Sequence, residues 1–306
     1  MVYDLIIIGA GPAGLQAALD ARYLKLSTLL LEAEKAGGAL SQSYPWKTVD
    51  SFLGFSEMTG RQISNRAVEH AKAVGAEIRE MEEVTAITRK GPEFTVRTEK
   101  GQYTGKSVIL ATGIRGIQRK LGIPGEELEG VSHFVTSTKK FSGKRVLVVG
   151  GGNSAADCAI GLDEAGAEVL MAHRRHELRA TGENTEKLPK SGVRMLWNTE
   201  LESISGKDAV EEATVVDNRT GKKSVLKVDN VIVCIGSVPA KDYLEGLGIR
   251  MKDSVVKVNE DGMTAIPGIF AAGDIVSGIK RIPQALATGE RAAYAAFKYI
   301  KNPYWE

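Results

Sequence analysis

Residues 4–14 read DLIIIGAGPAG, a short apolar run that passes directly into a glycine-rich turn. A helical pattern follows in LQAALDARYLK, residues 15–25, and a second apolar run, STLLLE at 27–32, ends in an acidic residue. Strand, glycine turn, helix and strand ending in an acid, all within about 30 residues, form the dinucleotide-binding pattern of a doubly wound α/β fold. The amino-terminal part of the chain is therefore expected to bind a dinucleotide.

Each position of this first motif has a predicted role. Gly9 permits the tight turn, Gly11 lets the backbone approach a pyrophosphate, and Gly14 lets the helix pack closely on the strand. Glu32 accepts hydrogen bonds from a ribose diol and repels a 2′-phosphate, which predicts an adenosine diphosphate with free ribose hydroxyls. The turn residues expected to contact it are Gly9, Gly11, Pro12, Ala13 and Gly14.

A second copy of the pattern begins at RVLVV, residues 145–149, and runs into GGGNSA at 150–155. Gly150, Gly152 and Ala155 occupy its three small-residue positions, with Asn153 and Ser154 between them. The next strand ends in HRRHELR, so the position of the acid is taken by three arginines, Arg174, Arg175 and Arg179. Two guanidinium bonds to a 2′-phosphate would favour NADP over NAD by roughly 100-fold or more. The alternative is a solvated basic loop.

One motif for a plain ribose and one for a 2′-phosphate together predict FAD at the first site and NADPH at the second. Two further segments agree with a flavin. ATG, which is Ala111, Thr112 and Gly113, follows an apolar strand. In AAGD, Gly273 is expected to let the backbone reach the isoalloxazine side of the flavin, and Asp274 to accept hydrogen bonds from the ribityl hydroxyls. The helix that follows begins near Gln284 and Ala285, where its dipole would stabilise negative charge on a reduced flavin. Alternatively, AAGD is only a helix entry with an N-capping aspartate.

Composition limits the class of protein. The chain has 306 residues, enough for about two domains. Its 40 Lys and Arg balance 38 Asp and Glu, so charge does not point to nucleic acid. The longest apolar stretch, Leu5–Leu19, is broken by glycines and lacks a basic start, so we expect neither a membrane span nor export. Cys158 and Cys234 fit no disulfide framework or metal motif and are expected to be buried and inert in a cytoplasmic protein.

GAGPAG, GGALS (37–41), ATG, GGGNSAADCA, HRRHELRA, CIGSVP and FAAGDI together resemble the low-molecular-weight thioredoxin reductase family over essentially the whole chain. The resemblance implies two Rossmann-like, three-layer ββα domains, with the NADPH domain (115–241) inserted into a discontinuous FAD domain (1–114 and 242–306). It also implies a homodimer. Further contacts implied by the matched motifs are Gly38 and Leu40 for FAD, and His173, Ile235 and Gly236 for NADPH.

The chain departs from thioredoxin reductases at one decisive place. These enzymes carry a CxxC just before the second glycine motif, where this chain has Phe134 and Ser137. No thiol there passes electrons to a protein disulfide. The stretch QSYPWKTVDSFLGF, residues 42–55, instead resembles the LSxxYPxKxVxxxxGF pattern of ferredoxin–NADP reductases of the thioredoxin reductase-like type, which also lack the CxxC. In those enzymes a tyrosine stacks on the isoalloxazine ring, which implies this role for Tyr44.

The predicted function is FAD-dependent electron exchange between NADP(H) and ferredoxin or flavodoxin, with the flavin carrying the chemistry and no catalytic protein acid or base. The alternatives are another acceptor, such as oxygen, a quinone or an unknown protein, and a non-enzymatic redox sensor. Relatives of the ferredoxin reductase type cover one flavin face with a carboxy-terminal extension. Tyr304 and Trp305 are the candidates for this role here; alternatively, they pack on a dimer neighbour or stay mobile. An acidic carrier would dock on a basic patch, for which the candidates are Arg115, Arg119, Lys120, Lys139, Lys140, Lys144 and Arg145.

Overall fold

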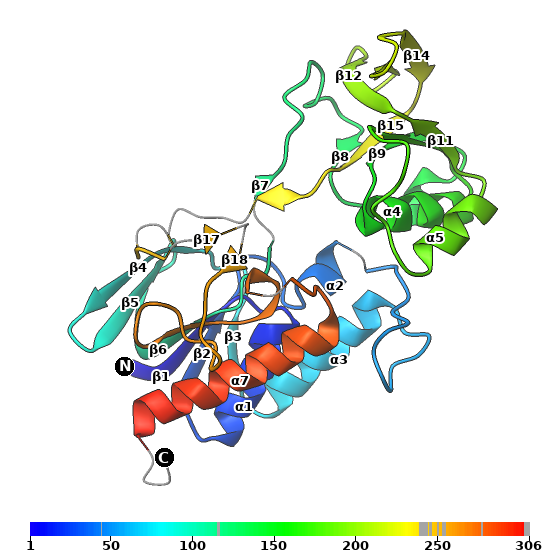
Figure 1. The fold of residues 1–306 in the computed structure, drawn as a ribbon. Coiled ribbons are helices and arrows are strands. Elements are labelled where there is room, and N and C mark those ends of the chain that lie inside the picture. Colours follow the sequence, from blue (N-terminus) through cyan, green and yellow to red (C-terminus); the bar gives the residue numbers. More distant parts are fainter. Residues whose placement is uncertain are drawn as a thin grey trace. The chain divides into compact units, whose positions relative to one another are not determined.

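The computed structural model describes residues 1–43, 45–114, 117–238, 244, 247–249, 251–252, 255–276 and 278–302. The chain divides into two compact units: an outer unit, Met1–Ile117 with Val238–Glu306, and an inserted unit, Gln118–Ser237 (Figure 1). The boundaries placed from the sequence lie after residues 114 and 241. The predictions for Tyr44, Arg115, Tyr304 and Trp305 concern residues outside the described part of the chain.

The outer unit is built on one mixed sheet. Its order is β3 (Glu77–Arg79), β2 (Thr28–Leu31), β1 (Val2–Ile8), β6 (Gln102–Leu110), β5 (Glu93–Thr98) and β4 (Val84–Lys90), and β19 (Ile269–Ala271) also pairs with β6. β3, β2, β1, β6 and β19 are parallel, whereas β4 and β5 continue from β6 as an antiparallel meander. The apolar run after Asp4 is buried along its whole length, as expected of a central parallel strand covered on both faces.

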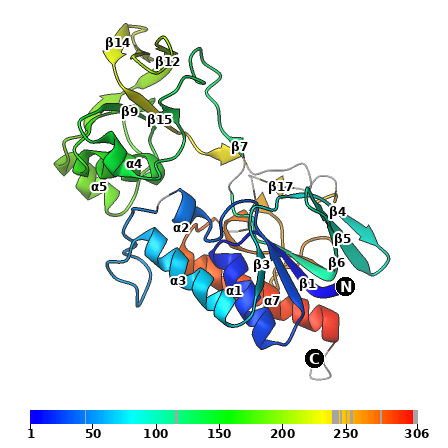
Figure 2. The ribbon, with the colours of Figure 1, turned by 180° about the vertical axis from the view of Figure 1, so that it is seen from behind.

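Helices cover one face of this sheet: α1 (Pro12–Tyr23), α3 (Gly60–Ala73) and α7 (Ile282–Lys301) lie side by side (Figures 1 and 2). α1 and α7 cross closely, because a Cβ at Gly289 would lie 2.2 Å from the carbonyl oxygen of Ala13. On the other face, Ile6, Ile8 and Leu29 share a core with the meander residues Phe94 and Val96. The short elements are α2 (Ala39–Gln42), β17 (Met251–Lys252), β18 (Val255–Val256) and the 3₁₀ turn η3 (Gly273–Ile275).

The inserted unit repeats this plan with a smaller parallel sheet. Its order is β11 (Arg194–Trp197), β10 (Glu168–His173), β9 (Arg145–Gly150), β15 (Asn230–Cys234) and β8 (Val131–Ser132). α4 (Asn153–Glu164) packs on β9 and β10, and the antiparallel strands β12 (Thr199–Ser205), β13 (Glu212–Asp217) and β14 (Lys223–Lys227) cover the opposite face. The remaining elements are α5 (Asn184–Lys187), η1 (Thr138–Phe141), η2 (Leu188–Lys190), and β7 (Ile117–Gln118) paired with β16 (Ser237–Val238) where the chain crosses between units.

Each unit therefore has a helical layer, a parallel sheet and an antiparallel layer, which confirms the predicted α/β fold with two Rossmann-like ββα units. Within the described residues, every helix is too short or too polar to cross a bilayer.

Candidate functional site

The predicted flavin motifs meet at one edge of the outer sheet. The strand register places Ile8 opposite both Leu31 and Leu110, and Leu110 opposite Ala271. The carboxyl ends of four parallel strands are thus level, and dinucleotides bind at this edge in doubly wound sheets. The segments that follow these ends are the glycine turn, Glu32, the ATG stretch and the AAGD stretch, which lie far apart in the sequence.

The glycine turn has the geometry that the sequence predicts. Gly9 has a φ of +101°, and a Cβ there would lie 2.5 Å from the carbonyl oxygen of Ala111. A Cβ at Gly14 would lie 1.8 Å from the carbonyl oxygen of Gly9, so helix and strand are in direct contact. Gly11 differs, because a Cβ there would meet only the Cα of Gly38, at 3.8 Å. The backbone of Gly11 therefore offers an open approach, bordered by the GGALS stretch.

The amino terminus of α1 is suited to a pyrophosphate. Its N-cap, Gly11, has no side chain to bond the free N–H groups, and the first turn carries no acid. These N–H groups and the positive end of the helix dipole thus stay available to an anion.

Two backbone N–H groups, one in the glycine turn and one just after β2, hold the Glu32 side chain in place. Its Oε2 accepts the N–H of Ala10 at 2.7 Å, and its Oε1 accepts the N–H of Glu34 at 3.0 Å. Each carboxylate oxygen accepts more than one hydrogen bond, so acceptor capacity remains for a ribose diol. The acid is thereby oriented by backbone donors without any ligand.

The AAGD stretch packs onto α1 and α7. A Cβ at Gly273 would lie 2.9 Å from that of Ala13, and the N–H of Gly273 donates to Thr288 Oγ1 at 2.9 Å. Asp274 is the second residue of η3, and burial raises the pKa of its carboxyl, against the lowering effect of Lys280. The alternative of an N-capping aspartate is wrong, since Ala272 is the N-cap of η3 and α7 begins only at Ile282. In the first turn of α7, Gln284 is half-buried and Ala285 buried.

The second glycine motif repeats the construction in the inserted unit. Gly150 pairs with Cys234 at the ends of β9 and β15, and a Cβ at Gly150 would lie 2.9 Å from that of Ala155. A Cβ at Gly152, the N-cap of α4, would have nothing within 4 Å. The first turn of α4 also lacks an acid, so it presents the same open anion site as α1.

The side chain of Asn153, predicted to contact NADPH, is engaged within the protein. Its Oδ1 accepts the N–H of Thr181 at 2.8 Å. Asn184, at the start of α5, donates to Asp157 Oδ1 at 2.9 Å. These bonds join the segment after the arginines to the first turns of α4.

The arginine loop, residues 174–179, is exposed at its guanidinium groups but fixed along its backbone. Side-chain and backbone donors from two neighbouring turns bind its first carbonyls, and its last N–H binds the glycine motif. The bonds are Asn218 Nδ2 to the Arg174 carbonyl at 2.8 Å, the Asn198 N–H to the Arg175 carbonyl at 3.2 Å, and the Arg179 N–H to the Gly151 carbonyl at 2.8 Å. The loop is thus preorganised to present three cations beside the open end of α4.

The His173 side chain lies between the arginine loop and the second glycine motif. Its ring lies against Gly151, where a Cβ would be 2.1 Å from Cε1. Its Nε2 lies 2.9 Å from the Glu177 carbonyl oxygen, which can only accept, so Nε2 carries the proton. Burial lowers the pKa of His173, and so do the charges of the three loop arginines, although the bond to Glu177 opposes them. The neutral imidazole therefore packs against the glycine motif and hydrogen-bonds to the arginine loop.

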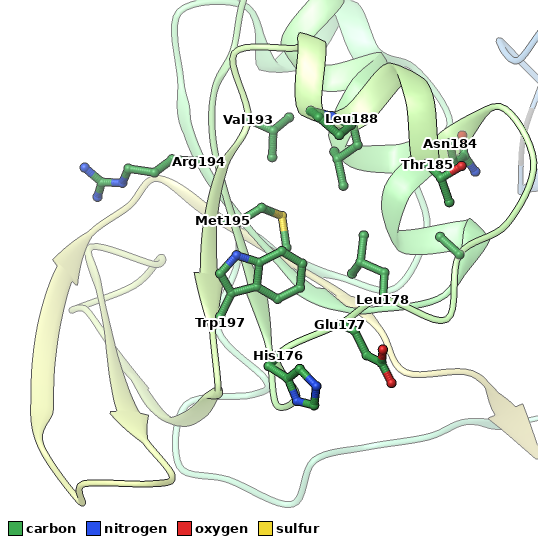
Figure 3. A pocket seen from close by; sticks show the side chains of 12 residues that line it. His176, Glu177, Leu178, Asn184, Thr185, Leu188, Val193, Arg194, Met195 and Trp197 are labelled. Atoms are coloured by element: carbon green, nitrogen blue, oxygen red, sulfur yellow. The ribbon is translucent and has the colours of Figure 1, made fainter.

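A cavity of about 700 Å³ lies behind the arginine loop, within the inserted unit (Figure 3). Leu178 of the loop and Leu188 line it together with Met195 and Trp197 of β11. His173 contacts Trp197 edge to face, with ring centroids 6.4 Å apart. One side of the arginine loop therefore borders this largely apolar cavity.

Sequence reasoning missed three supports of the arginine loop: Gly151, Asn198 and Asn218. The extra glycine in GGGNSA was a usable signal, because the three-position template leaves its middle residue unexplained. The two asparagines stand in turns that look like ordinary loops in the sequence.

The prediction for the cysteines needs a correction. Cys158 is buried, at 3% exposure, but Cys234 is only half-buried. The neighbouring Cys234 side chain, together with burial, raises the pKa of the Cys158 thiol. The sequence does not show that the two cysteines are neighbours, because they lie far apart in it. They come together only because α4 packs on the sheet that contains β15.

Comparison with known proteins agrees with this architecture. The sequence profile of the pyridine nucleotide-disulphide oxidoreductases matches residues 3–289. The chain is 36% identical over 304 residues to a ferredoxin–NADP reductase of Ignicoccus hospitalis, covering 99% of both chains. It is 36% identical over 311 residues to a thioredoxin reductase of Bacillus subtilis, covering 98% of this chain and 96% of the relative. The crystal structure of Lactococcus lactis thioredoxin reductase superposes with a TM-score of 0.91 at 30% identity, covering 98% of this chain and 100% of that one.

These matches extend over both units and both glycine motifs. They confirm the resemblance to thioredoxin reductases and ferredoxin–NADP reductases, and with it the prediction of FAD and NADPH as cofactors. The chain belongs to the pyridine nucleotide-disulphide oxidoreductase family.

Proposed function

We propose that this flavoprotein oxidoreductase exchanges electrons between NADP(H) and ferredoxin or flavodoxin without a redox-active disulfide. The observation that carries the proposal is the replacement of a CxxC pair by Phe134 and Ser137 in a chain that carries both dinucleotide-binding motifs. Relatives named ferredoxin–NADP reductase match almost the full length, including one of Thermus thermophilus at 33% identity over 318 residues. Free thiols suit a reducing compartment, so we place the activity in the cytoplasm.

In this proposal the outer unit binds FAD. The open end of α1 holds the pyrophosphate, Glu32 the adenosine ribose and Asp274 the ribityl chain, while Tyr44 stacks on the ring. The start of α7, at Gln284 and Ala285, faces the flavin with the positive end of its dipole. The fit rests on the backbone cradle at Gly11 and on the absence of acids from the first turn of α1.

The inserted unit binds NADPH. The open end of α4 at Gly152 receives the pyrophosphate, and the arginine loop receives the 2′-phosphate. Its backbone bonds to Asn218, Asn198 and Gly151 hold the loop before the nucleotide arrives, which reduces the entropy lost on binding. Ile235 and Gly236, directly after β15, complete the site. When bound, NADPH supplies a hydride that FAD accepts and passes on as single electrons.

Some of the basic residues proposed to bind an acidic carrier are already paired with carboxylates of this chain. Lys120 pairs with Glu127 at 2.5 Å, and Arg145 lies 4.0 Å from Asp229. Lys139, Lys140 and Lys144, in and after η1, are exposed. We therefore assign docking to these three lysines and to Arg119, which is also exposed, with charge steering that salt weakens. Lys139→Glu with Lys140→Glu should slow ferredoxin reduction, whereas the control pair Lys222→Glu with Lys227→Glu should not.

We also propose a homodimer through the helical face of the outer unit. Leu53 is 97% exposed and Tyr23 75% exposed. Beside them, apolar side chains of α1, α3 and α7 and the stacked rings of Phe52 and Phe55 line a cavity of about 320 Å³. Light scattering should give the mass of two chains, and Leu53→Asp should shift the protein toward one; a monomeric parent protein would refute the dimer.

Anaerobic stopped-flow spectroscopy tests the function. The purified yellow protein is mixed with NADPH or NADH, and oxidised ferredoxin or flavodoxin is then added. Fast bleaching with NADPH followed by rapid reoxidation by either carrier is expected. Bleaching without reoxidation would point to oxygen, a quinone or another acceptor, and no bleaching would favour a redox sensor. Reduction of thioredoxin by NADPH would contradict the proposed absence of disulfide chemistry.

A further inference from the structure

The two cysteines flank the same residue of the second glycine motif. Cys234 is the last residue of β15 and pairs with Gly150 in the sheet. Cys158 lies one helical turn after Ala155, and Ala155 packs against Gly150. The Cys234 side chain is near enough to raise the pKa of the Cys158 thiol. The fold thus makes the two cysteines neighbours beside the phosphate-binding turn.

The sheet explains why the two side chains share one layer. Val231 and Val233 of β15 point into the core formed with β12 and β13. Because side chains alternate along a strand, Ile232 and Cys234 point to the opposite face, which α4 covers. Cys158 is 3% exposed, whereas Cys234 is half-buried at the strand end. A small solute that enters at the strand end therefore reaches Cys234 first.

We propose that Cys158 and Cys234 form an oxidisable thiol pair that a hydroperoxide converts to a disulfide. The Cys234 thiolate attacks the peroxide O–O bond, which gives a sulfenic acid and releases water or an alcohol. The Cys158 sulfur then attacks the Cys234 sulfur, the S–O bond breaks, and the hydroxyl leaves as water with the Cys158 proton. The two cysteines lose two electrons in total and the peroxide gains them.

This bond would act on the nucleotide site, a consequence that rests on the proposed binding of NADPH. A disulfide requires a Cα separation of roughly 4.4–6.8 Å and a fixed torsion, so it clamps α4 to the end of β15. Gly150 lies within this clamp, and a Cβ there would already be 2.4 Å from the Cys234 carbonyl oxygen. We expect closure to restrain the turn that receives the pyrophosphate, together with Ile235 and Gly236. We expect oxidation to weaken NADPH binding about tenfold, and reduction to restore it.

The test uses the full-length, FAD-loaded protein treated with hydrogen peroxide, then denatured and alkylated. Intact-mass and peptide analysis should show the loss of two hydrogens, no alkylated cysteine, and one linked peptide pair that dithiothreitol separates. Cys158→Ala should instead leave Cys234 to gain oxygen atoms, and Cys234→Ala should leave Cys158 reduced. Two alkylatable thiols after peroxide, or oxygen added to Cys234 in the parent protein, would overturn the proposal.

NADPH affinity is measured on the same samples, with Cys158→Ala/Cys234→Ala as the control that peroxide should not affect. A linked pair with unchanged NADPH affinity would overturn the coupling to the nucleotide site. The thiol readout needs no nucleotide, so a reduced protein that fails to react with NADPH would count against the proposed function and leave the disulfide result intact.

Discussion

Gly151→Ala tests whether the middle glycine of the second motif exists to accommodate His173. The backbone of Gly151 lies outside the left-handed region, so alanine carries no conformational penalty there. The new Cβ would nevertheless lie 2.1 Å from Cε1 and 2.6 Å from Nε2 of His173. The imidazole must move, and its bond to the Glu177 carbonyl breaks as it does so.

The size of the effect follows from these contacts. Overpacking a filled interior costs about 1–3 kcal/mol, and losing a hydrogen bond costs about 0.5–1.5 kcal/mol. The free energy of unfolding should therefore fall by about 2–4 kcal/mol. Displacement of the arginine loop should remove at least one charged bond to the 2′-phosphate, which raises the KM for NADPH about tenfold or more and leaves that for NADH much less changed.

Urea denaturation and steady-state kinetics with both nucleotides measure the two effects. Gly152→Ala is the matched control: its Cβ would meet nothing within 4 Å, so stability should hold while both nucleotides bind less tightly. Combining Gly151→Ala with His173→Ala should cost less stability than the two single changes added together, because the second change removes the obstructing ring. If Gly151→Ala leaves both the stability and the ratio of the KM values for NADPH and NADH unchanged, Gly151 is not needed to accommodate His173.

Three further predictions concern the same region. Replacing Arg174, Arg175 and Arg179 with alanine should raise the KM for NADPH by roughly 100-fold or more and barely change that for NADH, as measured in steady state; equal effects would remove the phosphate assignment. Asn218→Ala should raise the KM for NADPH about two- to tenfold at constant kcat, because it removes the hydrogen bond to the Arg174 carbonyl. Asn218→Asp also removes the side-chain N–H donor, so an unchanged KM in this variant would show that the donor is dispensable. The lowered pKa of His173 means that the unfolded chain takes up a proton first as the pH falls below about 6.5, so the stability of the parent protein should decline there. His173→Asn should lack this component in urea titrations at several pH values, and an identical pH profile would contradict it.

The elements that bind phosphate were predictable from the sequence because their constraints are local. A glycine at Gly9 or Gly14 is required by contacts within a single strand–turn–helix unit, and the helices and strands around both motifs appear where the pattern places them. Glu32 and the arginine loop occupy corresponding positions, each directly after the second strand of its motif. Comparing these two strand ends in the sequence is enough to show this. The insertion of one domain into the other came only from resemblance, since no local pattern encodes it.

The supports of the site were not predictable, because they depend on contacts between distant segments. Asn218 reaches the Arg174 carbonyl from the β13–β14 turn, and Cys234 lies near Cys158 on the face of the sheet that α4 covers. Neither contact leaves a period or a spacing in the sequence. Only the register of β9 with β15 and the position of the hairpin over β10 show that these residues are neighbours.

The pairing of β19 with β6 affects the order in which the chain folds during synthesis. Ile269–Ala271 must reach Val108–Leu110, and the entire inserted unit is made between them. The ribosome thus releases a complete inserted unit, with all five strands of its parallel sheet, before the outer sheet has its last strand. Domains fold as units during translation, so the second domain in the fold becomes the first to be finished. Until α7 emerges, the apolar surface of α1 that it covers stays open to solvent, and it is in this interval that the nascent protein is most exposed to aggregation.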